Sequence, residues 1–327
     1  QYPIIIGACS VAITSAALLA VVSCSVSART FIAMGLDDAL TVSFLVLSLS
    51  DLCYVASLLS SGVFSVLWAV EMISNYAVRF GVDPYGAYIL TSNVGFLIYP
   101  MTMLTTTFLA VARCMCVARP LRFGDLFSTR RCATALAAFV VLTVASYVPV
   151  LSNLGVGEAF DPRVNLTRLL VWSSGDRQFV RDVVLGTRDT FLSITSQIIV
   201  TACVFVLSFY LRRAQSFRRS SSLAIQRDGT PSSSEAFDGR ELRVVQQVTV
   251  ISSVYVLCNF PKVLVNISGI LEPDLKFTKR FQKVYQLIII IMNLFQVLNC
   301  GINITIYYRY NTKFRRFFGG YSQYIIR

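Results

Sequence analysis

The sequence has no histidine and few charged residues. Asp, Glu, Lys and Arg make up 14% of its 327 residues, whereas soluble proteins usually carry about 25%. Without histidine, the chain cannot use Ser-His-Asp or Cys-His catalysis, histidine metal sites or histidine pH switches. It also lacks a GxxxxGK phosphate loop and a GxGxxG dinucleotide motif. We therefore expect neither an enzyme nor a resident cofactor.

The cysteine pattern is not that of a disulfide-stapled extracellular domain. Every cysteine falls within or beside an apolar run, and the long connecting loops contain none. The nine positions are Cys9, Cys24, Cys53, Cys114, Cys116, Cys132, Cys203, Cys258 and Cys300. A disulfide framework is therefore not predicted.

The chain is rich in long hydrophobic runs, and 55% of its residues are hydrophobic. A helix of about 20 apolar residues crosses a bilayer core of about 30 Å. Runs that approach or exceed this length occupy residues 4–28, 40–68, 86–118, 131–153, 188–212, 243–270 and 283–308. Residues 4–26 are uncharged and too long for a signal-peptide core. The sequence thus predicts an all-α membrane protein, a single seven-transmembrane helix bundle over residues 1–327.

The distribution of Lys and Arg predicts the orientation of this bundle. One set of alternate loops and ends carries a net charge of about +10, and the other set about +1. The positive-inside rule then places the N-terminus outside the plasma membrane and the C-terminus in the cytoplasm. The sequon Asn165, Leu166, Thr167 falls in a loop assigned to the outside, which agrees because N-glycosylation needs lumenal exposure.

The segment 213–240 is rich in serine and arginine and has no apolar periodicity. It is expected to be a flexible cytoplasmic loop. Within it, Arg218 to Ser221 resembles a site for a basophilic kinase, and the plainer alternative is a solvated linker without a regulatory role.

Ionisable residues inside a membrane span cost free energy, so each one indicates a possible structural or functional role. Asp51 lies deep in the second span, Arg113 ends the uncharged stretch of the third, and Glu241 opens the sixth. Lys262 lies about 12 Å from the end of the sixth span at about 1.5 Å per residue, too deep for comfortable snorkelling. One hypothesis is that Lys262 faces a pocket and attracts a carboxylate. Snorkelling or pairing with another helix is the alternative.

Two spans carry further local signals. Pro261 removes a helical hydrogen bond in the sixth span, so a kink is expected there. Asn299, Asn303 and Tyr307 are spaced by four residues and share one face of the seventh span. Hydrogen bonds between helices would by themselves account for these amides.

Four motifs, taken together, resemble those of rhodopsin-like G-protein-coupled receptors. Leu47 to Leu52 resembles the LxxxD signature of the second helix, and Ala112 to Cys114 resembles the DRY box. Cys258 to Pro261 resembles CWxP, and Asn303 to Tyr307 resembles NPxxY. Their order and separation agree with that family over essentially the whole chain. Residues 311–320 then resemble its short amphipathic eighth helix.

Four short sequence segments are most similar to those of gastropod mollusc chemosensory receptors. The resemblance rests on Arg113-Cys114-Met115-Cys116, Pro120-Leu121-Arg122, Val250-Ile251-Ser252-Ser253 and Asn303-Ile304-Thr305-Ile306-Tyr307-Tyr308. These receptors are similar to neuropeptide receptors of the same class, so a neuropeptide receptor is the first alternative.

The chain also departs from the family pattern. Ala112 replaces the acid of the DRY box, Asn259 the tryptophan of CWxP, and Ile304 the proline of NPxxY. Tyr88 stands where the family has its disulfide cysteine. The outer loop that follows the fourth span must therefore be held by other contacts, or it is loose.

The resemblance implies that an extracellular small-molecule or peptide ligand activates a heterotrimeric G protein at the cytoplasmic end. The residues implied in coupling and activation are Arg113, Glu241, Pro261, Asn303 and Tyr307. A pair between Arg113 and Glu241 could hold the inactive state, and the alternative is that Glu241 is a solvated helix start.

The resemblance also implies a ligand pocket and a polar core. The pocket candidates are Tyr99, Asn259, Lys262, Asn293 and Gln296. The residues that match the family's sodium site are Asp51, Thr102, Asn299 and Asn303, and a protonated Asp51 hydrogen-bonded to the amides is the alternative. Gly95 replaces the acid that binds amines and Val297 the retinal lysine, so an amine receptor and an opsin are disfavoured.

Two alternatives lie outside receptor signalling. A transporter or channel is disfavoured because the spans lack discontinuous helices, inverted halves and rings of charge. A receptor-like protein that no longer signals would agree with the departures from the motifs. The basic face could also bind anionic membrane lipids. Nucleic-acid binding is not expected, since the charge is spread over membrane-adjacent loops.

Overall fold

The computed structural model describes residues 2–118, 127–228, 239–272 and 281–325. Helices make up 82% of it, and seven are long and apolar enough to cross a membrane. These helices are α1 (Tyr2–Ala33), α2 (Ala39–Ile73), α3 (Pro84–Ala118), α5 (Thr129–Ala145), α8 (Thr190–Asp228), α9 (Gly239–Leu271) and α10 (Gln282–Tyr310). The shorter α6 (Val148–Leu151) extends α5, and α7 (Arg177–Val184) and the π-helical turn η1 (Leu185–Asp189) precede α8. The helical class and the seven apolar helices are confirmed.

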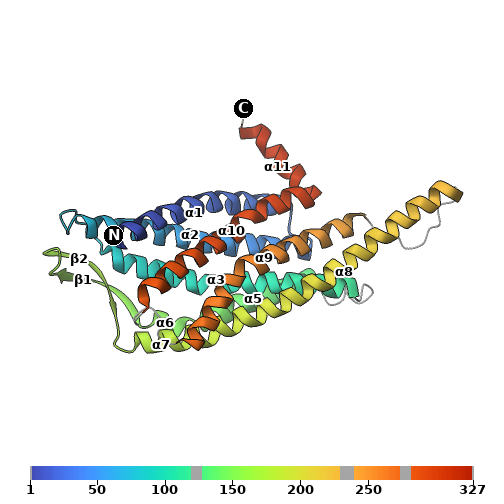
Figure 1. Ribbon diagram of the computed structural model, residues 1–327. Coiled ribbons are helices and arrows are strands. Elements are labelled where there is room, and N and C mark those ends of the chain that lie inside the picture. Colours follow the sequence, from blue (N-terminus) through green and yellow to red (C-terminus); the bar gives the residue numbers. More distant parts are fainter. Residues whose placement is uncertain (1, 119–126, 229–238, 273–280, 326–327) are drawn as a thin grey trace.

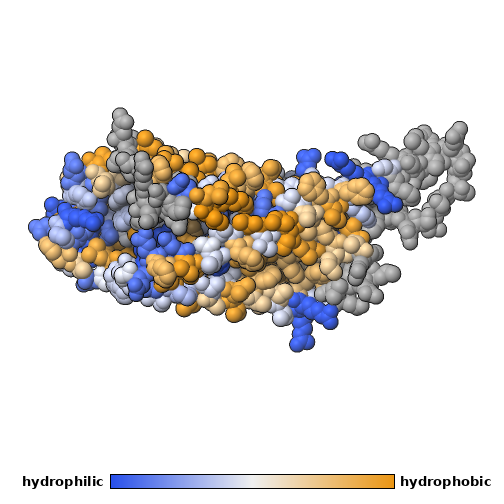
Figure 2. Space-filling view, turned by 60° about the horizontal axis from the view of Figure 1, so that its bottom comes forward, coloured by the Kyte–Doolittle hydropathy of each residue, from blue (hydrophilic) through white to orange (hydrophobic). Residues whose placement is uncertain are grey.

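The long helices lie side by side, with α3 in contact with α2, α5, α8 and α9, and α1 in contact with α2 and α10 (Figure 1). Apolar side chains such as Leu19 and Phe205 point outward, and hydrophobic residues cover most of the middle of the face shown in Figure 2. Exposed apolar surface of this extent is consistent with a multi-pass membrane protein. The end with the strands β1 (Leu154–Asp161) and β2 (Leu166–Ser173) is called the hairpin end below. The opposite end, where α11 (Thr312–Ile325) begins, is called the α11 end.

The structure moves several predicted boundaries. The first helix runs to Ala33 instead of residue 28, and α8 continues to Asp228, so residues 213–228, expected in a loop, are helical. Residues 213–228 contain neither glycine nor proline, the two residues that most disfavour a helix. Residues 229–238 lie outside the described residues.

A β-hairpin corrects the all-α prediction. β1 (Leu154–Asp161) pairs antiparallel with β2 (Leu166–Ser173), and Leu169 of β2 also forms a bridge with Val82, before α3. At the turn, Asn165 adopts a φ of 51°, a left-handed conformation that asparagine tolerates better than most residues. Its exposed side chain leaves the sequon accessible.

A short helix follows the last long one, as expected. α11 (Thr312–Ile325) runs further than the predicted 311–320. Phe314 anchors it, because this fully buried ring lies 5.1 Å from the ring of Phe31 and 5.6 Å from that of Tyr307. The aromatic contacts tie α11 to the ends of α1 and α10 and fix where it begins.

Candidate functional site

A buried polar network joins three helices around Asp51. The Thr102 hydroxyl donates to Asp51 Oδ1 at 3.0 Å, and Asn303 Nδ2 donates to Asp51 Oδ2 at 2.9 Å. Asp51 lies on α2, Thr102 on α3 and Asn303 on α10, and all three side chains are buried. Residues far apart in the sequence thus meet at one carboxyl group.

The network also offers oxygen ligands for a small cation. Asn303 Oδ1 is buried and has no hydrogen-bond partner, and it belongs to the same side chain that donates to Asp51. A hard cation prefers several such oxygens, so Asp51, Thr102 and Asn303 fit the chemistry of a sodium site. Asn299, the fourth candidate, is buried one turn earlier on α10. A sodium ion bound here would be held by these oxygens.

Two of the coupling candidates, Arg113 and Tyr307, lie nearer the α11 end. Arg113 is buried in the last turns of α3, and the fully buried Tyr307 packs on Phe31 and Phe44 with ring centroids at 4.9 and 5.5 Å. Pro261 lies inside α9, where a kink was predicted. The side chain of Glu241 lies outside the described residues, so its predicted pair with Arg113 stays a prediction.

A second polar cluster surrounds Lys262. The Lys262 side chain is 5% exposed, and its Nζ lies 4.0 Å from the centre of the Tyr99 ring and 3.9 Å from Met103 Sδ. Tyr99 donates its hydroxyl hydrogen to Asn259 Oδ1 at 3.1 Å. No carboxylate in the described part of the chain lies within 4.0 Å of Lys262 Nζ. Asp189 forms its ion pair with Arg188 instead. The ammonium group is therefore desolvated beside an aromatic face and a thioether.

Other predicted pocket residues border this cluster. The Tyr54 hydroxyl donates to Gln296, and the Tyr54 ring lies 4.9 Å from the ring of Tyr99. Asn293 is half-buried, one turn before Gln296 on α10. The structure thus brings Tyr99 into contact with Asn259 and Lys262 and links Gln296 to them through Tyr54.

Sequence reasoning missed Gln197 and Tyr54. Asn259 Nδ2 donates to Gln197 Oε1 at 3.1 Å, and Gln197 Nε2 donates to the backbone oxygen of Val256 at 3.0 Å. An amide in the apolar α8 was a visible signal, because such groups usually bond across helices. The partner of Tyr54 could not be read from the sequence.

A buried ion cluster anchors the hairpin. The Arg168 side chain is 1% exposed, and its guanidinium lies 2.7 Å from Glu71, 2.6 Å from Asp161 and 3.5 Å from Asp83. Glu71 lies in the last turn of α2, and Asp83 directly precedes α3. Asp161 belongs to β1 and Arg168 to β2. All nine cysteines are free. Of the two alternatives for the loop after the fourth span, held by other contacts or loose, the structure shows the first.

The charges in this cluster support one another. Burial alone would raise the pKa of Asp161, but the Arg163 amide and the Arg168 guanidinium outweigh it and hold the pKa below its usual value. Burial likewise opposes the charge on Arg168, and the hydrogen bonds to Asp161 and Glu71 outweigh it and raise its pKa. Both groups are therefore charged at neutral pH.

Comparison of the sequence with models of known protein families and with curated proteins gives no match. The functional argument therefore rests on the residues and their contacts.

Proposed function

We propose that this chain is a seven-transmembrane receptor of the rhodopsin-like type that passes an extracellular chemical signal to a heterotrimeric G protein. The hydrogen-bonded set Asp51, Thr102 and Asn303 carries the proposal. Two motif positions that resemble this family, Asp51 and Asn303, are some 250 residues apart in the sequence and meet there with Thr102 through side-chain contacts. A short helix anchored by Phe314 after the last span supports the same reading.

In this proposal the Lys262 cluster binds the ligand, and the polar network around Asp51 links the helices that respond to it. A ligand that binds near Lys262 would touch α3 and α9, and Asp51 links α2 and α3 to α10. A receptor needs two packings that differ by a few kcal/mol and a ligand that prefers one of them. In this proposal the ligand shifts α9, and the buried Arg113 at the end of α3 meets the G protein. A chemosensory ligand is the proposed signal, on the finer sequence resemblance.

Nucleotide exchange tests the signalling proposal. Receptor in lipid nanodiscs should speed GTPγS uptake by a promiscuous G protein when an agonist from a chemical library is added. Arg113→Gln should lower that stimulated rate at least tenfold, because it removes the charge from the proposed G-protein contact. Arg130→Gln, at an exposed position of α5, is the matched control and should change the rate less than twofold. Ion flux through reconstituted vesicles without any nucleotide exchange would instead identify a transporter or channel.

The sequon tests the orientation. If the hairpin end is extracellular, the protein expressed in animal cells should carry a glycan at Asn165 that an endoglycosidase removes. Thr167→Ala should abolish the shift in electrophoretic mobility, whereas Thr167→Ser, which preserves the sequon, should keep it. These substitutions leave the left-handed Asn165 untouched. A cytoplasmic hairpin, found by tagging both ends of the bundle in intact cells, would contradict the proposed topology.

A further inference from the structure

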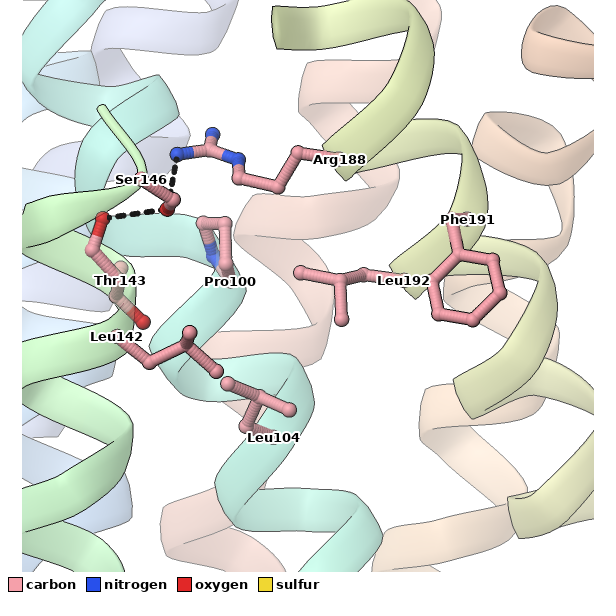
Figure 3. Close-up of a pocket in the computed structure, with 8 residues that line it drawn as sticks. All are labelled: Pro100, Leu104, Leu142, Thr143, Ser146, Arg188, Phe191 and Leu192. Carbon is pink, nitrogen blue, oxygen red and sulfur yellow. Dashed lines mark hydrogen bonds between the residues drawn. The ribbon is translucent and has the colours of Figure 1, made fainter. Parts of the chain in front are cut away.

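A cavity of about 150 Å³ lies between α3, α5 and the start of α8 (Figure 3). Leucine, proline and phenylalanine form most of its wall. The lining residues are Pro100, Leu104, Leu142, Thr143, Ser146, Arg188, Phe191 and Leu192. It is separate from the Lys262 cluster and from the Asp51 network, none of whose members line it.

The cavity opens on the outside of the helices. Leu142 on α5 and Phe191 on α8 flank it and are 54% and 67% exposed. Both lie within helices that are apolar enough to cross a membrane. In a bilayer the mouth of the cavity therefore faces lipid, and a molecule would enter it from the hydrocarbon phase.

Two helix irregularities meet at this cavity. Pro100 has no N–H, so the Phe96 carbonyl four residues earlier in α3 cannot receive its helical hydrogen bond. Arg188 supplies the missing donor, with Nη2 2.8 Å from the Phe96 oxygen. Arg188 itself belongs to η1, and π-helical turns are frequent at functional sites. The cavity thus lies where α3 and α8 both depart from regular geometry.

The polar rim carries no net charge. Arg188 pairs with Asp189 at 2.7 Å and lies 4.7 Å from the centre of the Tyr147 ring, and its Nη1 is 3.4 Å from Ser146 Oγ. Asp189 already neutralises the guanidinium, so an anion would gain little from binding here and a cation would meet no free carboxylate. Charge and wall chemistry together select a neutral, apolar occupant.

We propose that this cavity is a binding site for a neutral, benzene-sized aromatic molecule that enters from the lipid. An apolar protein cavity of about 150 Å³ is large enough to hold benzene. The molecule would pack between the turn of α3 that contains Pro100 and the π-helical turn η1. Binding would stabilise the conformation in which α3 and α8 are far enough apart to leave the cavity open. The site depends only on the packing of these helices and goes beyond the receptor proposal.

Fluorobenzene is a suitable probe, because ¹⁹F NMR separates saturable binding from partition into lipid. Protein in nanodiscs should give a saturable change in line width that empty nanodiscs lack. Leu192→Trp fills the cavity and should lower the affinity more than tenfold, and Leu104→Phe should also lower it. Val141→Trp adds the same ring to α5 at an exposed position outside the lining and should stay within twofold of the unsubstituted protein.

Several results would overturn the site. One is a change in line width that grows linearly with fluorobenzene, as in empty nanodiscs. Another is that Leu192→Trp and Leu104→Phe bind fluorobenzene with the affinity of the unsubstituted protein while keeping its thermal unfolding temperature. A third is a photoreactive phospholipid acyl chain that labels Leu142 or Phe191 and is not displaced by fluorobenzene, which would identify a lipid chain as the occupant.

Discussion

Replacement of Arg168 by methionine should release the β1–β2 hairpin and speed hydrogen exchange of its backbone amides by about 100- to 4,000-fold. Removing one partner of a buried ion pair costs about 3–5 kcal/mol, because the remaining charge stays buried without compensation. Here Arg168 faces Glu71, Asp161 and Asp83, so three carboxylates lose their shared cation. Hydrogen exchange measured by mass spectrometry on hairpin peptides would detect the release.

The same hairpin provides controls. Arg163→Met makes the same chemical change at an exposed turn residue, whose backbone rather than side chain bonds Asp161, and should leave exchange nearly unchanged. Adding Glu71→Gln to Arg168→Met should restore part of the protection, because it removes one uncompensated carboxylate. If Arg168→Met exchanged no faster than Arg163→Met, the bridge to Val82 and the turn would hold the hairpin by themselves.

Acid should release the hairpin only at low pH. Because the pKa of Asp161 in the folded protein lies below its usual value, its contribution is complete above the unfolded value of about 3.9. It is lost as the pH falls through the lower, folded pKa. Protection of the hairpin should therefore stay constant from neutral pH to about 4 and fall below it.

The fold was predictable where one residue type dominates a long stretch. Length and apolar content alone identify the seven long helices, since a run of about 20 apolar residues has few other stable forms. The hairpin was not predictable in this way. Its two strands are eight residues each, and its anchor pairs Arg168 with Glu71, 97 positions away. The sequence indicates that an outer loop without a disulfide needs another anchor, but not which residues form it.

The site was predictable where a costly residue type stands in an apolar span. Asp51 and Lys262 attract attention because charge in a membrane needs a reason, and both lie in polar clusters. Their partners were harder to predict. Thr102 and Asn303 came from the family resemblance. Tyr54 and Gln197 take part because α2 turns the first toward α10 and α8 turns the second toward α9.

Replacement of Lys262 by methionine should weaken a carboxylate agonist by about 100-fold or more while making the protein more stable. Methionine has a similar length and no charge, and replacing buried ionic groups with apolar residues of similar volume is often neutral or stabilising, by up to about 4 kcal/mol. No carboxylate in the described ranges lies within 4.0 Å to offset the burial of Lys262 Nζ. Residues that lower the stability of the fold are typical of functional sites, where activity requires them.

Two measurements on Lys262→Met therefore separate function from structure. A rise in the thermal unfolding temperature together with loss of response to a carboxylate, but not to its neutral methyl ester, is the expected pair of results. Lys313→Met, at an exposed position of α11, should change neither. A fall in unfolding temperature would show that the ammonium group supports the fold through Tyr99 and Met103. Equal loss of response to the acid and the ester would show that Lys262 shapes the pocket without recognising charge.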